Sequence, residues 1–273
     1  MKRIIALLLV IAMAACMFAG CAKQSESKPA DSEAKDEAAA TSDFDKIAED
    51  KKVIVGITDF APMDYKENGE WTGFDAELAR AVFGKLGLEC EFVEIDWDNK
   101  ILELNNGSID CVWNGMTLTD EVMSAMDCSK PYVVNAQVVV MKSDNPAVSG
   151  ATEESIADLS FAVEAGSAGE SAAKDREYAN ITSLAAQSNA LMEMEAGSAD
   201  ACIIDLTMAN AMTGEGTSYT DLVKVLDLDK EEYGIGFRKG SDVPEKVNKL
   251  LDEMKADGSL QALADKYELV LCD

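Results

Sequence analysis

Residues 53–113 read VIVGITDFAPMDYKENGEWTGFDAELARAVFGKLGLECEFVEIDWDNKILELNNGSIDCVW, and their apolar residues follow two different periods. The first five residues form a short apolar run of the kind that makes a buried strand. Residues 74–86 carry an apolar residue at every fourth position, on one face of a helix. The segments 91–95 and 109–113 are strand-like, and a helix ending at an Asn-Gly pair separates them. This order predicts a parallel sheet with right-handed crossovers.

The same alternation of strands and helices recurs in the second half of the chain. We expect strands at 136–141, 160–163, 201–204 and 233–237, and helices at 188–196 and from Asp242 onward. Two similar α/β halves predict two lobes with a ligand cleft between them, because open α/β sheets bind ligands beyond the carboxyl ends of their strands. We therefore expect an α/β fold in which each lobe is a mostly parallel sheet flanked by helices.

The lobes are assigned to three segments of the chain. Residues 53–136 are expected to form the first part of lobe 1, and 137–232 to form lobe 2. Residues 233–273 would then supply a return strand and the C-terminal helices of lobe 1.

The first twenty residues have the composition of a lipoprotein signal peptide. Lys2 and Arg3 precede an uncharged run that ends at Gly20, and Cys21 follows two small residues. We expect cleavage before Cys21 and acylation of the new N-terminus, which would hold the protein on a membrane without spanning it. Cleavage before Cys16, an ordinary secretory signal and an uncleaved helix remain alternatives.

Residues 21–52 are rich in Lys, Glu, Ser, Asp and Ala and poor in large apolar side chains. Such a stretch cannot bury enough apolar surface to offset the entropy lost on ordering. We expect a flexible stalk between the lipid anchor and the folded part. The protein would then be extracytoplasmic, on the outer face of the cell membrane, and its contact with the membrane would be through lipid only.

The composition argues against several classes of function. The formal net charge is −27, which would repel nucleic acids. The chain has no histidine, which removes Ser-His and Cys-His nucleophile pairs and His-ligated metals. We expect a monomer with no nucleic-acid partner, no cofactor, no metal and no enzymatic activity.

The cysteines beyond Cys21 lack a CxxC motif and are odd in number: Cys90, Cys111, Cys128, Cys202 and Cys272. We expect mostly free, buried thiols, as in a protein secreted by a Gram-positive anaerobe. A bridge between Cys111 and Cys128 is the disulfide to check first.

A set of short motifs runs along the chain in a fixed order. They are Val55-Gly56, Phe60-Ala61-Pro62, Gly73-Phe74-Asp75, Trp97-Asp98, Asn114-Gly115-Met116-Thr117, Pro131-Tyr132, Gly166-Ser167, Asp200-Ala201, Asp205, Tyr233-Gly234-Ile235 and Lys266-Tyr267. In this order the chain resembles the family 3 extracellular solute-binding proteins of ABC transporters, the polar amino-acid-binding group with the type II periplasmic binding fold. The resemblance implies capture of an amino acid or related amine and delivery to a membrane permease and its ATPase.

The resemblance also implies which aromatic residues contact the ligand. Phe60 matches the aromatic that covers the ligand, and Trp97 a position at the side of the pocket. Trp113 ends a strand that would point at the cleft. Each of the three could instead be a packing residue.

Polar contacts carry over in the same way. Asn114, Gly115 and Thr117 match the loop that binds the ligand's carboxylate. Ser167 is expected to begin a helix whose free N–H groups attract an anion. Asp205 matches the acid that binds the ligand's α-ammonium group through a charge-assisted bond.

One position departs from the family pattern. The family places an arginine three residues after the second threonine of this loop, which is Thr119 here, and that arginine clamps the α-carboxylate. In this chain the position holds Val122. Glu164 stands where the family usually has a neutral residue in contact with the ligand. The loss of a cation and the gain of an anion predict a preference for positively charged ligands, unless Glu164 points to solvent.

Two other classes of function remain open. The chain could be an enzyme on the same fold, because cyclohexadienyl dehydratase-like proteins resemble this family. It could also be a sensor that presents its ligand to a receptor.

Overall fold

The computed structural model describes residues 42–273. The expected signal peptide (1–20), the acylated Cys21 and the greater part of the expected stalk lie outside this range. Within it, no helix combines the length and the apolar character that crossing a membrane requires.

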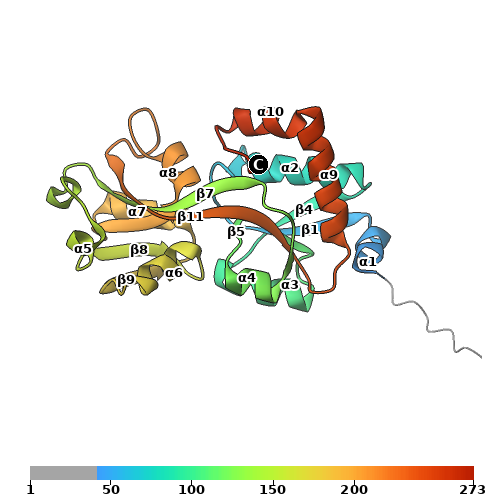
Figure 1. Cartoon of the computed structure of the whole chain (residues 1–273), viewed down its shortest axis with the longest axis horizontal. Helices are drawn as coiled ribbons and strands as arrows, with labels where there is room; N and C mark the ends of the chain where they lie inside the picture. The colour runs from blue at the N-terminus through green and yellow to red at the C-terminus, as the bar shows by residue number, and fades with distance from the viewer. Residues whose placement is uncertain (1–41) are drawn as a thin grey trace, which may run out of the picture. The chain divides into compact units, whose positions relative to one another are not determined.

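The first half of the described chain alternates strands and helices in the predicted order (Figure 1). Its elements are α1 (Asp43–Glu49), β1 (Lys52–Ile57), β2 (Tyr65–Glu67), β3 (Glu70–Thr72), α2 (Phe74–Lys85), β4 (Glu89–Glu94), η1 (Trp97–Asn99), α3 (Lys100–Asn106), β5 (Cys111–Thr117), α4 (Asp120–Ala125) and β6 (Asp127–Cys128).

The second half contains the two longest strands and the longest helix. Its elements are β7 (Val133–Lys142), η2 (Pro146–Val148), α5 (Glu153–Ile156), β8 (Ser160–Glu164), α6 (Ala168–Asp175), β9 (Asn180–Leu184), α7 (Gln187–Ala196), β10 (Ala201–Asp205), α8 (Leu206–Met212), β11 (Leu222–Phe237), α9 (Val243–Asp257) and α10 (Ser259–Lys266).

Nine of these strands form one sheet, whose main path runs β4-β1-β5-β11-β7-β10-β8-β9, with β6 beside β11. The pairs β1–β4, β1–β5, β8–β10 and β8–β9 are parallel. Strands β7 and β11 are antiparallel to each other and join the two parallel groups. Lobe 1 is the group around β1, β4 and β5, and lobe 2 is the group around β8, β9 and β10, which confirms the two-lobed α/β fold.

The link between the lobes consists of β7 and β11 (Figure 1). Strand β11 pairs with β7 from Leu222 to Tyr233 and with β5 from Tyr233 to Phe237. The expected lobe boundaries, after residues 136 and 232, fall inside these two strands. The division into 53–136, 137–232 and 233–273 therefore stays a prediction.

Helices cover both faces of the sheet in each lobe. In lobe 1, α2, α9 and α10 pack on one face, and Leu104 of α3 and Val122 of α4 pack on the other. In lobe 2, α7 and α8 pack on one face, while α5 and α6 cover the other. The strands that carry polar residues at their carboxyl ends are thus held rigidly from both sides.

Helix α9 forms where its sequence predicts. Its apolar residues Val247, Leu250, Leu251 and Met254 are buried on one face. Asp242 precedes the helix as expected, but its carboxylate accepts the N–H of Phe44 at 2.9 Å and makes no cap bond to α9.

Helix α1 corrects the end of the expected stalk, which we placed at 21–52. Ser42 caps this helix by accepting the N–H of Asp45, and Ile47 is buried against the core of lobe 1. Asp43 pairs with Arg238 at 3.1 Å. The polar average composition of 21–52 does not reveal the short helix α1, which buries Ile47. The end of this stretch therefore folds with lobe 1.

All five cysteines of the described chain are free, so Cys111 and Cys128 form no bridge. Cys111, Cys202 and Cys272 are buried, whereas Cys90 and Cys128 are half-buried. Burial raises the pKa of the Cys90 thiol to about 11, which keeps it protonated and unreactive at neutral pH.

Candidate functional site

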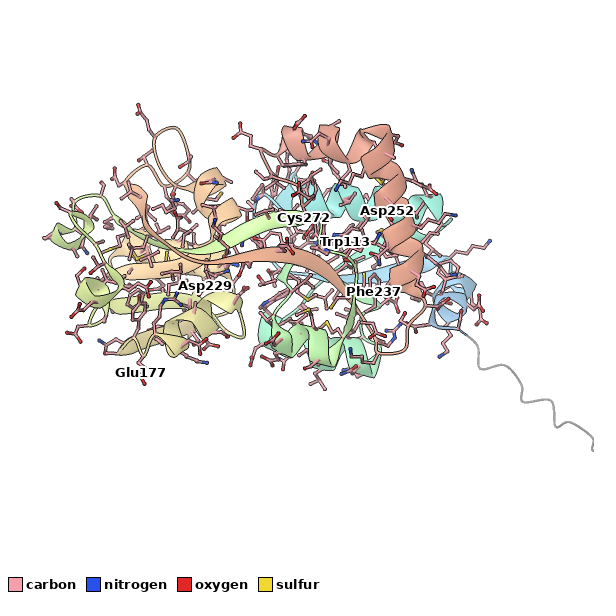
Figure 2. All side chains as sticks on the ribbon, in the orientation of Figure 1. Trp113, Glu177, Asp229, Phe237, Asp252 and Cys272 are labelled. Atoms are coloured by element: carbon pink, nitrogen blue, oxygen red, sulfur yellow. The ribbon has the colours of Figure 1, made fainter. Side chains whose placement is uncertain are left out.

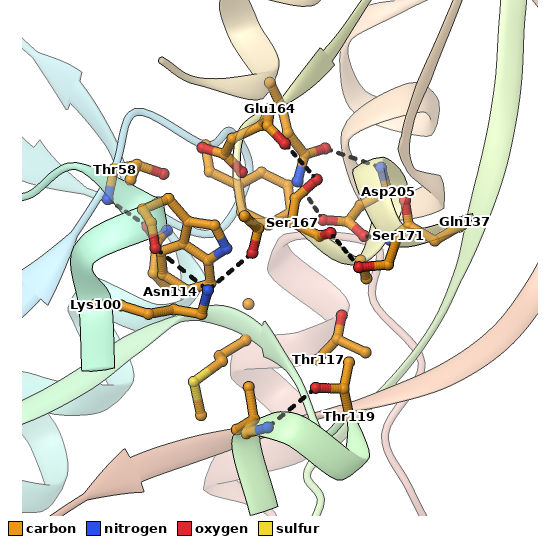
Figure 3. Close-up of a pocket in the computed structure, with 18 of the residues that line it drawn as sticks. Thr58, Lys100, Asn114, Thr117, Thr119, Gln137, Glu164, Ser167, Ser171 and Asp205 are labelled. Carbon is orange, nitrogen blue, oxygen red and sulfur yellow. Dashed lines mark hydrogen bonds between the residues drawn. The ribbon is translucent and has the colours of Figure 1, made fainter. Parts of the chain in front are cut away.

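A pocket lies where the carboxyl ends of β5, β8 and β10 face one another (Figure 3). It is lined by Thr58, Phe60, Trp97, Lys100, Asn114, Gly115, Met116, Thr117, Thr119, Glu121, Val122, Gln137, Glu164, Gly166, Ser167, Ala168, Ser171, Gln187 and Asp205. Both lobes contribute, as expected for a cleft at the ends of two parallel sheets.

Eight of the nine residues expected to contact the ligand line this pocket. They are Phe60, Trp97, Asn114, Gly115, Thr117, Glu164, Ser167 and Asp205. Trp113 does not: it is fully buried within lobe 1 (Figure 2), and its Nε1 donates to Asp75 at 3.2 Å. Its ring packs edge-on against Phe83. Neighbouring strand residues point to opposite faces, and the pocket receives Asn114 while the core receives Trp113.

Phe60 and Gly115 form one wall of the pocket together. Gly115 has a φ of +52°, and a Cβ built on it would lie 2.5 Å from the Phe60 ring. The ring of Phe60 also packs edge-on against Tyr233, with the ring centres 6.3 Å apart. Phe60 is only 3% exposed, so it borders the pocket and is at the same time a core residue.

The loop expected to bind a carboxylate already uses its donors inside the protein. The side chain of Asn114 accepts the N–H of Thr58 and donates to Asp64 at 3.0 Å. The N–H of Gly115 donates to Asp75 at 2.6 Å. The hydroxyl of Thr117 donates to Glu231 at 2.9 Å. In this state the N–H of Gly115 and the hydroxyl of Thr117 are already used, and the side chain of Asn114 is held by lobe 1.

Helix α6 points its N-terminus at the pocket from lobe 2, as predicted for Ser167. Ser167 is the N-cap: its hydroxyl accepts the N–H of Glu170 at 3.0 Å and donates to the carbonyl of Glu164 at 2.8 Å. Ala168 and Ser171 of the first turn also line the pocket. The positive end of this helix is therefore the part of the wall best suited to a carboxylate.

Asp205 is 3% exposed and is surrounded by amide side chains. Its carboxylate accepts from Asn135 at 2.7 Å, from Gln137 and from Gln187. Its own N–H donates to Gln187 Oε1 at 2.9 Å, which fixes the orientation of that amide. Burial, followed by the charge of Glu231, raises the pKa of Asp205 well above its usual range.

Glu164 faces the pocket and not the solvent. It is 3% exposed and lines the pocket, and its Oε1 has no hydrogen-bond partner. Burial raises the pKa of Glu164 from its ordinary value of 4.5 to about 8, while the nearby Lys100 opposes the shift. A buried carboxyl oxygen without a partner costs free energy, so this group is poised to accept a hydrogen bond from a ligand.

Lys100 is the one cationic side chain among the residues that line the pocket within 42–273. Its Nζ donates to the carbonyl of Trp97 at 3.2 Å and to the carbonyl of Gly166 at 2.8 Å. The second bond joins the lobes, since Lys100 begins α3 and Gly166 follows β8. Burial lowers the pKa of Lys100, and the acids Glu121 and Glu164 oppose that shift.

The lobes also touch beside this bond. A Cβ built on Gly166, which has a φ of +68°, would lie 2.7 Å from Cα of Asp98. Any larger residue at Gly166 would both strain the backbone and hold the lobes apart. The cavity that remains measures about 40 Å³, room for about three water molecules at 10–15 Å³ each. The lobes must separate to admit a larger molecule.

The position of the missing arginine lies in the pocket wall. Val122 lines the pocket and is 4% exposed. The three arginines of the described chain bind elsewhere: Arg80 to the carbonyl of Trp71, Arg176 to Glu153 and Asp229, and Arg238 to Asp43 and Asp110. None of them replaces the carboxylate clamp.

Sequence reasoning missed Lys100, Gln137 and Gln187. For Gln137 a signal exists: Asn135 and Gln137 are alternate polar residues inside an otherwise apolar strand, so they share one face and need polar partners. Lys100 and Gln187 each begin a helix next to the cleft, which only the fold reveals. No group of three or more His, Cys, Asp or Glu residues within 42–273 is placed to hold a metal ion.

Comparison with known proteins identifies the relatives of this chain. The model of the bacterial extracellular solute-binding proteins, family 3, matches residues 53–269. The arginine-binding extracellular protein ArtP of Bacillus subtilis is 33% identical over 226 residues, which cover 80% of this chain and 86% of that protein.

Solved structures of amino-acid-binding proteins have a similar fold. An ancestral arginine-binding protein bound to arginine superposes with a TM-score of 0.71 at 32% identity, covering 80% of this chain and 98% of that one. The ancestral amino acid-binding protein AncCDT-1, a precursor of cyclohexadienyl dehydratase, gives a TM-score of 0.74 at 33% identity, covering 83% of this chain and 99% of that one.

Proposed function

Because the chain belongs to family 3 of the bacterial extracellular solute-binding proteins, we propose that it captures a cationic amino acid or a related amine outside the cytoplasm and delivers it to the permease and ATPase of an ABC importer. The two buried acids of the pocket support this proposal. Asp205 and Glu164 are both buried in the wall, and Glu164 has an oxygen without a partner.

Each end of such a ligand has a matching part of the pocket. The α-ammonium group would bind Asp205, and the α-carboxylate would lie at the N-terminus of α6. A positively charged side chain would satisfy Glu164 and offset the cost of burying that carboxyl group. Glutamate or aspartate would instead bring a second carboxylate next to these acids, where like charges a few ångströms apart repel by about 4 kcal/mol at an effective dielectric of 20.

Closure of the lobes supplies the second half of the function. Lys100 and Gly166 join the lobes at 2.8 Å in the state described here. We propose that β7 and β11 bend to open the cleft, and that the closed, loaded form is the one recognised by the permease. The lipid anchor at Cys21 would keep the protein at the membrane surface near that permease.

Calorimetric titration of purified protein tests the ligand class. We expect L-arginine, L-lysine or L-ornithine to bind at least tenfold more tightly than L-glutamine, with no response to L-glutamate or L-aspartate. At a hundredfold excess over Kd, a ligand should stabilise the fold by about 2.7 kcal/mol, which a melting curve resolves. Tight binding of the acidic amino acids with no response to the cationic ones would overturn the proposal.

A second candidate is an enzyme on this fold, because one structural neighbour is a precursor of cyclohexadienyl dehydratase. That neighbour is itself described as an amino acid-binding protein. Incubation with prephenate or arogenate separates the two functions: we expect no product, and turnover that is lost in the Asp205→Asn variant would establish the enzyme.

A further inference from the structure

Glu231 lies beside Asp205 without being part of the pocket wall. It belongs to β11, next to a shift in the pairing of β11 with β7 between Asp227 and Lys230. The Nδ2 group of Asn135 donates to Asp205 Oδ1 at 2.7 Å and to Glu231 Oε1 at 2.6 Å. Two oxygens that share one donor in this way are within a few ångströms of each other.

Gln137 repeats the arrangement. Its Nε2 group donates to Asp205 Oδ1 and to Glu231 Oε1, the latter at 2.8 Å. Each amide group therefore donates one hydrogen to Asp205 and the other to Glu231. The carbonyl oxygen of Asn135 accepts the N–H of Thr207 at 3.2 Å, which leaves its nitrogen facing the two carboxyl groups. Asp205 and Glu231 thus accept hydrogen bonds from the same two amide groups.

The two amide groups of Asn135 and Gln137 hold two acids together, and no cation of the described chain lies between these acids. Amide donors stabilise carboxylates, but they carry no full charge, and Asp205 is almost completely buried. Two carboxylates this close in a buried site do not both ionise, because one proton removes the repulsion between them. Glu231 is half-buried and accepts from the hydroxyl of Thr117 as well, whereas Asp205 is almost completely buried. Burial disfavours the charged form, so we place the shared proton on Asp205. The raised pKa of Asp205 agrees with this assignment.

From this geometry we propose that Asp205 and Glu231 share one proton in the ligand-free protein and that the ammonium group of the ligand displaces it. The proton leaves to solvent as the ammonium takes its place, so the pair goes from one negative charge to two and the ligand's positive charge compensates the difference. Glu231 is then a positioning residue that acts through Asp205. This step rests on the proposed function, because it needs a ligand with an ammonium group.

Other titratable groups face the same region and must be separated from the pair. Glu164 from β8, Glu121 from α4 and Lys100 from α3 line the pocket with Asp205. The phenol of Tyr233, on β11, bonds to Thr207 at 2.9 Å. Glu164 can itself lose a proton to a cationic ligand. A change at Glu231 alone leaves Glu164, Glu121 and Lys100 as they are, so the difference between two proteins isolates the pair.

The first measurement needs no ligand. The ¹³C carboxyl resonance of Asp205, assigned with the Asp205→Asn variant, is followed from pH 4 to pH 9 in the wild type and in Glu231→Gln. We expect its titration midpoint in the wild type to lie above that of a free aspartic acid and to fall by about one pH unit or more in Glu231→Gln. An ordinary midpoint in the wild type, or the same midpoint in both proteins, would overturn the shared proton.

The second measurement uses L-arginine as the probe. We expect its Kd to fall as the pH rises through the neutral range in the wild type, and this dependence to be weaker by up to one proton in Glu231→Gln. The matched control is Glu232→Gln, at the next and exposed residue of β11, which should keep the wild-type slope. Equal slopes in all three proteins would overturn the proton release. Failure of L-arginine to bind would overturn the proposed function and the release step, while the titration without ligand still decides the shared proton.

Discussion

In the proposed function, two acidic residues set the selectivity of the pocket, and the strength of their interactions depends on burial. Asp205 and Glu164 are each 3% exposed, so solvent does little to screen them. Three neutral amides donate to Asp205, with the acid Glu231 close by, whereas Glu164 has an oxygen with no partner. The amides therefore fix the orientation of the Asp205 carboxyl group, whereas under the proposed function the free oxygen of Glu164 would gain its partner from the ligand.

Replacing Asp205 tests the ammonium site. Asp205→Asn keeps the shape of the side chain but removes its charge, and losing one partner of a desolvated charge pair costs about 2–5 kcal/mol. We expect the affinity for L-arginine to fall by well over tenfold in calorimetry, while Asp144→Ala, on the surface of lobe 2, leaves it unchanged. A loss of less than threefold would remove Asp205 from the site.

Glu164 makes the stability of the ligand-free protein depend on pH. Its pKa is raised from 4.5 to about 8, so the folded state binds more protons than the unfolded state between these values. Stability therefore falls as the pH rises through this window. Glu164→Gln removes the effect. We expect the variant to melt higher than the wild type, by a difference that grows from pH 5 to pH 8.5 and corresponds to up to a few kcal/mol.

Thermal melting across this pH range measures the effect, with Glu154→Gln on α5 as the exposed control in the same lobe. The control should follow the wild type throughout. A constant difference between Glu164→Gln and the wild type would show that the carboxyl group keeps its ordinary pKa.

At the scale of elements, the sequence predicts what local periodicity encodes. The strand–helix order of 53–113 and the helix after Asp242 are confirmed. Eight of the nine residues expected to contact the ligand line the pocket, because polar residues at the carboxyl ends of strands meet in one cleft. The full length of β11 was not predicted: many of its 16 residues are exposed or half-exposed, and its pairing shifts register twice against β7 and once against β5, so no simple alternation marks them. The contact between Lys100 and Gly166 depends on how the two lobes meet, and no local sequence pattern predicts that arrangement.

That contact between α3 and the loop after β8 should influence closure. A hydrogen bond from a charged donor is worth about 1.5–3 kcal/mol, and Lys100→Met removes the bond to Gly166. We expect the ligand-free variant to open, with a larger radius of gyration in X-ray scattering than the wild type. Lys249→Met, at an exposed position of α9, is the control. If both variants scatter like the wild type, the bond does not hold the lobes together.

At the scale of the whole molecule, the proposed function gives one chain two separate tasks, capture of the ligand and attachment to the membrane. The described residues 42–273 contain the cleft, the linking strands β7 and β11, and helix α1. The residues that would fix the protein to a membrane precede them. The proposed importer function needs both, because a captured ligand must be released close to a permease.

Membrane attachment is tested at Cys21. In the host cell, Cys21→Ser should leave the protein unprocessed or release it into the medium, because the acyl acceptor is gone. Cys16→Ser should stay processed and membrane-bound, which sets the two possible cleavage sites apart. Fractionation and intact-mass measurement give the answer. A Cys21→Ser protein that remains correctly cleaved and membrane-bound would show that the anchor lies elsewhere.

The pairing of β5 with β11 has a consequence for how the chain reaches its native state. Lobe 1 is assembled from the two ends of the described sequence, and Arg238 binds Asp43 across 195 positions. Synthesis proceeds from the N-terminus, so β5 is complete long before its partner Tyr233–Phe237 exists. Until then β5, with the buried sequence CVWNGMT, has an unpaired apolar edge of the kind that aggregates. Lobe 1 therefore cannot complete its sheet until residues 233–237 have been made, whereas the parallel strands of lobe 2 lie close together in the sequence and can pair earlier.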